Sequence, residues 1–126
     1  MLDKVEYWLE LCEDDLKTAK VLLDNKQLLW MGFVCHLIIE KAIKAMVASK
    51  TNETPTKTHS LDKLAELADI NYELTETQKC LLDKLTPLHI EGRYPEYKER
   101  INALLTKQYC EQLLMETEEF VCWIRS

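Results

Sequence analysis

The sequence predicts an all-α protein, an up-and-down helical bundle of about four to five helices. Glycine and proline are scarce, at two and three residues among 126, and a sandwich or barrel needs more turns than these supply. Apolar residues make up 47% of the chain and charged residues 30%, and the apolar ones recur at helical spacing. We therefore expect residues 1–126 to form a single helical domain, because this length is sufficient for one core.

Residues 2–24 form the first predicted helix, in which apolar side chains at helical spacing face a charged and solvated side. Asp24–Lys26 breaks the pattern. A turn this short makes the first two helices antiparallel neighbours.

Trp30–Lys50 is predicted to be the central helix and one of the two longest. One continuous half of its helical wheel is apolar, which is typical of a helix inside a bundle; it holds Val34, Cys35, Ile38, Ile39, Ala42, Ile43, Ala45 and Met46. The opposite half mixes two kinds of side chain. A polar stripe at i, i+4 spacing consists of His36, Glu40 and Lys44. Large apolar residues lie among them, namely Trp30, Phe33, Leu37 and Val47. We therefore expect this half to be covered, in part within the chain and in part by a second copy.

Thr51–Lys57 is the clearest loop, because Pro55 prevents any helix from continuing through it. A third helix is predicted to begin near Thr58 or Ser60, and either residue can cap it. Asp69–Leu74 forms the next connection.

Thr75 and Gln78 have the spacing of a capping box, so a fourth helix is predicted to start there. Pro87 is expected to kink or end that helix. His89–Arg100 is irregular by composition and is predicted to be a loop. The last helix is predicted from about Thr106 to Ile124, with a regular apolar stripe.

The net charge of −6 argues against nucleic-acid binding by general phosphate attraction. The charge is uneven along the chain. Residues 1–24 hold seven acids and three lysines, whereas residues 25–63 hold six lysines and three acids. An anionic ligand is therefore expected near the middle third of the chain.

The five cysteines form no CxxC pair and have no zinc-ligand spacing with histidine, so neither a metal site nor a cofactor is predicted. An odd number of cysteines without a disulfide framework fits free thiols in a reducing cytoplasm. The N-terminus does not resemble a signal peptide, and no apolar run reaches transmembrane length.

Candidate functional residues are few: three histidines and a handful of cations. His36, Glu40 and Lys44, with Lys41 beside them, form either a helix-surface or buried polar network at an interface, or a ligand site. Lys57 and His59 lie at a predicted helix start, where free N–H groups suit a phosphate, although a capping and packing role fits equally. Arg93 and Tyr94 can bind a phosphate and stack a base, or Arg93 can clamp an acid of the first two helices.

Four features, in order, resemble the small prokaryotic proteins of the HEPN domain family. Trp8 with the later pair Asp15-Leu16 is similar to the first helix of that family. Phe33 followed by EKAIKA at residues 40–45 resembles its central helix. KTHSL at residues 57–61 resembles its K-T-H-x-L helix start, and RYP at residues 93–95 resembles its R-Y-P segment. Together these features span most of the chain.

The resemblance implies a helical bundle that dimerises and that is often encoded beside a minimal nucleotidyltransferase, in toxin–antitoxin or nucleotide-handling pairs. Many relatives resemble RNases in which an arginine is followed by a histidine a few residues later. Here every histidine precedes Arg93, so that motif is absent. Leu37 also stands where many relatives have glutamine.

Three functions follow as hypotheses. The first is a dimeric binding module that partners a nucleotidyltransferase and binds a nucleotide through Lys41, Lys44, Lys57, His59, Arg93 and Tyr94. Its interface would contain Trp30, Phe33, His36, Leu37 and Glu40. The second is a metal-independent RNase toxin, in which His59 or His89 meets Arg93 in space. The third is a structural interaction bundle without a small ligand.

Overall fold

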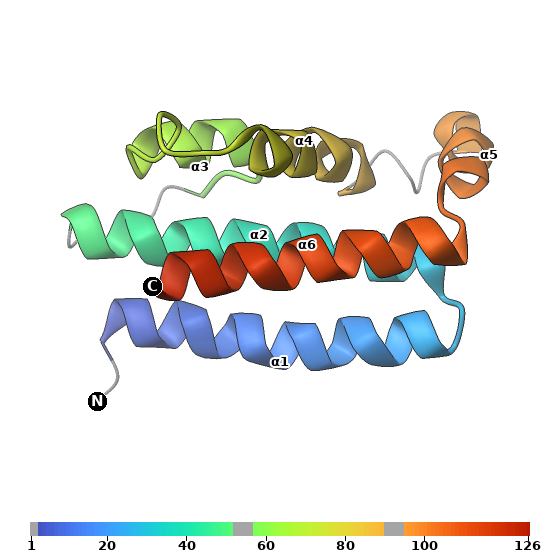
Figure 1. Cartoon of the computed structure of the whole chain (residues 1–126), viewed down its shortest axis with the longest axis horizontal. Helices are drawn as coiled ribbons and strands as arrows, with labels where there is room; N and C mark the ends of the chain where they lie inside the picture. Colours follow the sequence, from blue (N-terminus) through green and yellow to red (C-terminus); the bar gives the residue numbers. More distant parts are fainter. Residues whose placement is uncertain (1–2, 52–56, 90–94) are drawn as a thin grey trace.

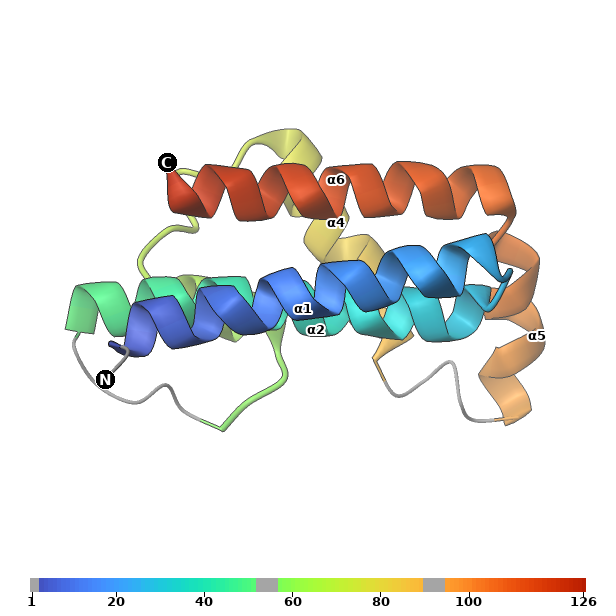
Figure 2. The same cartoon turned by 90° about the horizontal axis from the view of Figure 1, so that it is seen from below.

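The computed structural model describes residues 3–51, 57–89 and 95–126, and every regular element within these ranges is helical. The all-α prediction is confirmed. The three longest helices pack together along their lengths (Figures 1 and 2): α1 (Lys4–Asp24), α2 (Leu28–Thr51) and α6 (Lys107–Arg125). Helix α2 is antiparallel to α1, as the short turn between them predicts, and α6 runs parallel to α2.

The remaining elements cover α2 and close one end of the bundle. They are α3 (Leu61–Leu67), α4 (Glu76–Leu85), the short 3₁₀ helix η1 (Thr86–Leu88) and α5 (Pro95–Leu104). Helices α3 and α4 lie along the side of α2 that faces away from α1 (Figure 1). Helix α5 crosses the end at which α2 and α6 begin. Among the described residues, no helix has both the length and the apolar character needed to span a membrane.

The helix starts follow local capping chemistry, which explains why they were predictable. Thr75 and Gln78 make both hydrogen bonds of the capping box, at 3.1 and 2.8 Å. Ser60, one of the two predicted caps, accepts from the backbone N–H of Lys63 at the start of α3. Helix α4 ends before Pro87, which falls inside η1, as expected for a residue that cannot continue a helix.

One predicted loop is in part helical. His89–Arg100 was expected to be irregular, but α5 begins at Pro95 and continues through Arg100 to Leu104. Proline is favoured at the first position of a helix, because its φ suits the helix and its missing N–H has no partner there. The prediction of a loop was therefore wrong from Pro95 to Arg100. Because of α5, the described part of the chain has six α-helices.

The core is centred on α2, as predicted. Most of its apolar half is closed to solvent, with 0% exposure at Met31, Cys35, Ile38, Ile39, Ala42, Ile43 and Ala45, whereas Val34 and Met46 are partly buried. Val47, on the opposite half, is 5% exposed and belongs to the core, because α3 packs on α2; that half was expected to be covered in part within the chain. All five cysteines are free thiols; Cys80 and Cys122 are exposed.

Candidate functional site

All three histidines of the chain converge on one side of α2. His36 and Glu40 lie one turn apart on α2, His59 precedes the cap of α3, and His89 follows η1. The ring centroids of His36 and His89 are 4.5 Å apart, and so are those of His59 and His89. We call these three histidines and Glu40 the histidine cluster.

Gly32 explains how His89 reaches α2. A Cβ atom at Gly32 would lie only 3.0 Å from Cδ1 of Leu88, so the absence of a side chain lets η1 pack closely on the helix. Leu88 is 2% exposed in this contact. The next residue, His89, is thereby brought beside His36, one turn further along α2.

Glu40 is the hub of the histidine cluster and is 4% exposed. Its Oε1 accepts a hydrogen bond from Nδ1 of His59 at 3.0 Å, and its Oε2 accepts one from Nζ of Lys44 at 3.1 Å. Nδ1 of His36 lies 3.7 Å from the same Oε1, too far for a hydrogen bond. A buried carboxylate is stable only with such partners, and Glu40 has two.

Burial and hydrogen bonding set the charge states of His36 and Glu40, the two buried residues of the histidine cluster. Burial lowers the pKa of His36 to about 4, the neighbouring His89 contributes to the lowering, and Glu40 opposes the shift. His36 is therefore neutral at pH 7. Burial alone would raise the pKa of Glu40, but the hydrogen bonds from His59 and Lys44 outweigh it and lower the pKa below its usual 4.5. Glu40 is therefore a carboxylate at pH 7.

The two candidate lysines of α2, Lys41 and Lys44, are both engaged within the chain. Lys41 forms an ion pair with Asp15 of α1, away from the histidine cluster. Lys44 forms its ion pair with Glu40, and its ammonium lies 5.4 Å from the centroid of the Trp8 ring. The motif residues Trp8 and Asp15 of α1 thus contact Lys44 and Lys41 of α2, which favours the structural interpretation for these cations.

Comparisons with known proteins show the family and the fold of the chain. The family model for the HEPN domain matches residues 5–126. The chain belongs to the HEPN domain family. The HEPN domain also resembles a solved structure, the crystal structure of TT1696 from Thermus thermophilus, with a TM-score of 0.80 at 21% identity over 98% of each chain. At that identity the likeness shows the fold alone. No curated protein matches the sequence.

The HEPN domain brings only some of the predicted ligand residues together. Lys57 and His59 are exposed at the start of the segment that leads into α3, and His59 reaches Glu40. Lys44 lies in the same network, whereas Lys41 faces α1. The remaining two candidates, Arg93 and Tyr94, lie outside the described residues.

The predicted interface residues of the HEPN domain separate into two groups. His36 and Glu40 are covered by their own chain, through His59 and His89, rather than being open to a partner. Trp30 is 50% exposed and meets Phe33 edge-to-face, and Leu37 is partly exposed. Trp30 and Phe33 line a hollow of about 240 Å³, the aromatic pocket, together with Leu29, Leu88 and Lys98.

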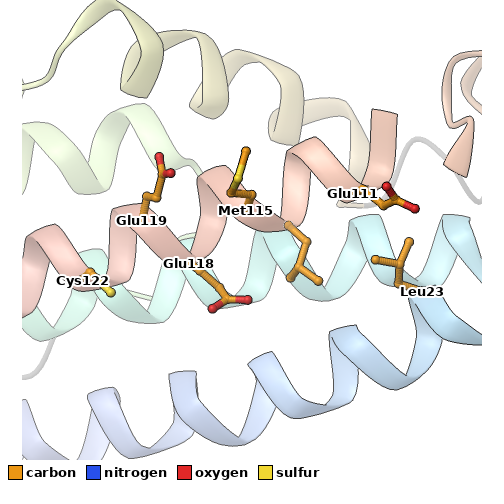
Figure 3. Close-up of a pocket in the computed structure, with 7 residues that line it drawn as sticks. Leu23, Glu111, Met115, Glu118, Glu119 and Cys122 are labelled. Atoms are coloured by element: carbon orange, nitrogen blue, oxygen red, sulfur yellow. The ribbon is translucent and has the colours of Figure 1, made fainter. Parts of the chain in front are cut away.

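A second hollow of the HEPN domain, of about 510 Å³, lies between α1 and α6 and contains none of the predicted residues (Figure 3). Leu23 and Leu114 form part of its apolar floor, whereas Glu111, Glu118 and Glu119 give it an acidic rim. Such a rim repels phosphates. This hollow therefore does not suit an anionic ligand, and the histidine cluster with the adjoining aromatic pocket remains the candidate site.

Sequence reasoning missed the convergence of the three histidines. Their separation in sequence, at positions 36, 59 and 89, gives no linear motif. The available signals were indirect: the polar stripe on α2, and Pro87, which ends α4 just before His89. The close approach at Gly32 depends on how η1 packs, and no local pattern encodes that.

Proposed function

We propose that this HEPN domain is a binding module that works as a homodimer and partners a minimal nucleotidyltransferase, in a toxin–antitoxin or nucleotide-handling system. The observation that carries the proposal is the aromatic pocket, where Trp30 is 50% exposed. Fully burying a large apolar side chain stabilises a protein by about 1.5–3 kcal/mol. A protein surface that covers Trp30 and Phe33 gains part of that energy.

A second copy of the chain is the occupant that suits the aromatic pocket best. A two-fold interface brings the same surface patch together twice, so like charges face each other. Of the five lining residues, only Lys98 is charged, and the rest are apolar or aromatic. The nucleotidyltransferase would then bind elsewhere on the dimer.

Sedimentation velocity tests the dimer. Wild-type protein is expected to sediment as a dimer and Trp30→Lys as a monomer with unchanged helical circular dichroism, because the half-exposed Trp30 contributes little to the monomer core. Phe33→Lys is the harsher variant, since Phe33 is partly buried and lies 5.4 Å from the His89 ring, centroid to centroid.

Tyr72→Lys is the matched control, because Tyr72 is an aromatic residue that is 87% exposed on the α3–α4 connection. It should remain dimeric. A monomeric wild type, or a Trp30→Lys variant that stays dimeric, would contradict the interface. Co-purification with a nucleotidyltransferase encoded beside this chain tests the partner, and failure of the two proteins to associate would contradict that part of the proposal.

The proposal includes a nucleotide whose phosphates contact Lys57 and His59, with Arg93 and Tyr94 as further candidates. Its support is the exposure of Lys57 and His59 and the excess of lysine over acid in residues 25–63. Calorimetric titration with ATP should show binding that Lys57→Ala weakens by about fivefold, the equivalent of about 1 kcal/mol for an exposed ion pair. Lys79→Ala, at another exposed lysine, should bind as the wild type does. Equal effects of the two substitutions would contradict this site.

The metal-independent RNase remains a second candidate because of one observation. The rings of His59 and His89 stack at 4.5 Å, and two adjacent imidazoles can act as acid and base. The absence of the arginine-then-histidine motif predicts no strong cleavage of single-stranded RNA by the purified protein. Cleavage that is lost in His59→Ala or Arg93→Ala would favour the RNase over the binding module.

A further inference from the structure

The histidine cluster contains three potential metal ligands at close range. The ligand atoms of His36, Glu40 and His89 all lie within 4.8 Å of one another. Two of these residues project from one face of α2, and the third is delivered by η1 across the Gly32 contact. Tertiary packing thus assembles this ligand set. It lies apart from the proposed dimer surface, except that His89 also contacts Phe33.

Nδ1 of His36 is an unsatisfied polar atom. The residue is 1% exposed, and this nitrogen has no hydrogen-bond partner among the described residues. Leaving a buried polar group unpaired costs about 1–3 kcal/mol, so native structures rarely retain one without a reason. The nitrogen lies 3.7 Å from the carboxylate of Glu40. An ion between these two atoms would satisfy the nitrogen.

The donor atoms suit a cation. An imidazole can offer the lone pair of a ring nitrogen, and a carboxylate offers an oxygen. Lys44 holds Oε2 of Glu40, which leaves Oε1 on the side of the histidines. Two imidazoles and one carboxylate form the ligand set of many zinc sites that keep a fourth position open.

We propose that His36, Glu40 and His89 bind a divalent transition-metal ion, and that Zn²⁺ is the ion this ligand set fits best. Zinc–nitrogen and zinc–oxygen bonds of about 2.0–2.2 Å place tetrahedral ligand atoms about 3.3 Å apart. The 3.7 Å separation of His36 from Glu40 is close to that value. The other ligand atoms lie within 4.8 Å, so His89 has to approach by at most about 1.5 Å. His89 is partly exposed and follows a helix of only three residues, so it is the ligand best able to shift.

His59 completes the surroundings of this metal site. Its ring stacks on that of His89, and its Nδ1 binds the carboxylate oxygen that would face the metal. Because its side chain is 62% exposed, it can turn to become a fourth ligand or give way to a water molecule. The bound metal would therefore have one coordination position that His59, water or a ligand from solution can occupy.

The test is calorimetric titration of EDTA-treated, dialysed protein with Zn²⁺, without nucleotide, together with the visible spectrum of the Co²⁺ form. We expect one ion per chain and the d–d bands of four-coordinate Co²⁺. His89→Ala should weaken Zn²⁺ binding at least tenfold, and Glu40→Gln should do the same while preserving side-chain volume. Circular dichroism verifies that both variants are folded.

The double variant Cys80→Ser/Cys122→Ser is the control, because these two thiols are exposed and bind zinc nonspecifically. It should retain both the affinity and the Co²⁺ spectrum. Binding that is lost in the cysteine variant but kept in His89→Ala would overturn the proposal, as would the absence of Zn²⁺ binding in the wild type. The inference does not rest on the dimer, because monomeric Trp30→Lys should bind Zn²⁺ as the wild type does.

Discussion

The two sides of α2 are built on different principles. On the side facing α1 and α6, residues such as Ile38, Ile39 and Ala42 are fully buried among other apolar side chains. On the side facing His59 and His89, a carboxylate, an ammonium and imidazoles are arranged as specific pairs. Both sides are closed to solvent over most of their length, yet only the second depends on particular atoms of particular partners.

The difference separates the side of α2 that holds the fold together by general packing from the side that depends on specific pairs. Apolar packing tolerates exchange among side chains of similar volume. A buried ion pair does not, because removing one partner leaves an uncompensated charge. We therefore expect the polar side to respond more sharply to single substitutions, and to be rescued by paired ones.

The largest effect is expected for Glu40→Leu, measured by urea unfolding in the presence of EDTA. The substitution leaves Lys44, whose side chain is 11% exposed, without its carboxylate, and it removes the acceptor for His59. Removing one member of a buried pair typically costs about 3–5 kcal/mol. The free energy of unfolding should fall by about that amount.

Glu40→Leu/Lys44→Met sharpens this comparison, because it replaces the pair by apolar side chains of similar size. Such replacements are often neutral or stabilising, so the double variant should recover most of the lost stability. If the double variant is no more stable than Glu40→Leu, the lost stability comes from the contact with His59 or from packing. The ion pair would then not distinguish the two sides of α2.

A loss of about 2–5 kcal/mol is expected for Ile39→Ala on the apolar side, where the residue is 0% exposed. Val21→Ala is the matched control, because Val21 is β-branched, helical and 59% exposed; it should change stability by less than about 0.5 kcal/mol. The measurement is the urea unfolding midpoint of Ile39→Ala compared with that of Val21→Ala. Equal midpoints would contradict the packing assigned to α2.

The apolar side was predictable from sequence because helical periodicity reports which residues face a core, whatever lies opposite. The Thr75 and Ser60 caps were predictable for the same reason, since capping acts within four residues. Helix α5 was not, because Pro95 is compatible both with a loop and with a helix start, and only packing against the end of the bundle decides between them.

Only one part of the histidine cluster could be predicted from the sequence. The stripe of His36, Glu40 and Lys44 was visible in the sequence, and its burial was one of the two interpretations. Its partners were not visible, because His59 and His89 lie 19 and 49 residues beyond Glu40 and arrive on separate segments. His36 and Glu40 were predicted to lie at an interface with a second copy, and within the single chain His59 and His89 already cover them.

The smallest effect expected is a difference in thiol reactivity between neighbouring parts of the same bundle. Cys12, Cys35 and Cys110 are fully buried, and burial raises their pKa values to about 12, 12 and 11. The thiolate is the reactive form, so these three are both inaccessible and protonated at pH 8. A chromogenic disulfide reagent at that pH should therefore modify two thiols per chain quickly, the exposed Cys80 and Cys122, and the other three only on unfolding.

Cys35 is the informative thiol, because it precedes His36 and points from α2 into the apolar core. In Glu40→Leu under native conditions, Cys35 should stay protected if the damage is confined to the polar side of α2. Its rapid modification in that variant would mean that the two sides open together. Fast reaction of three or more thiols in the wild type would contradict the tight packing of the apolar side, on which the comparison depends.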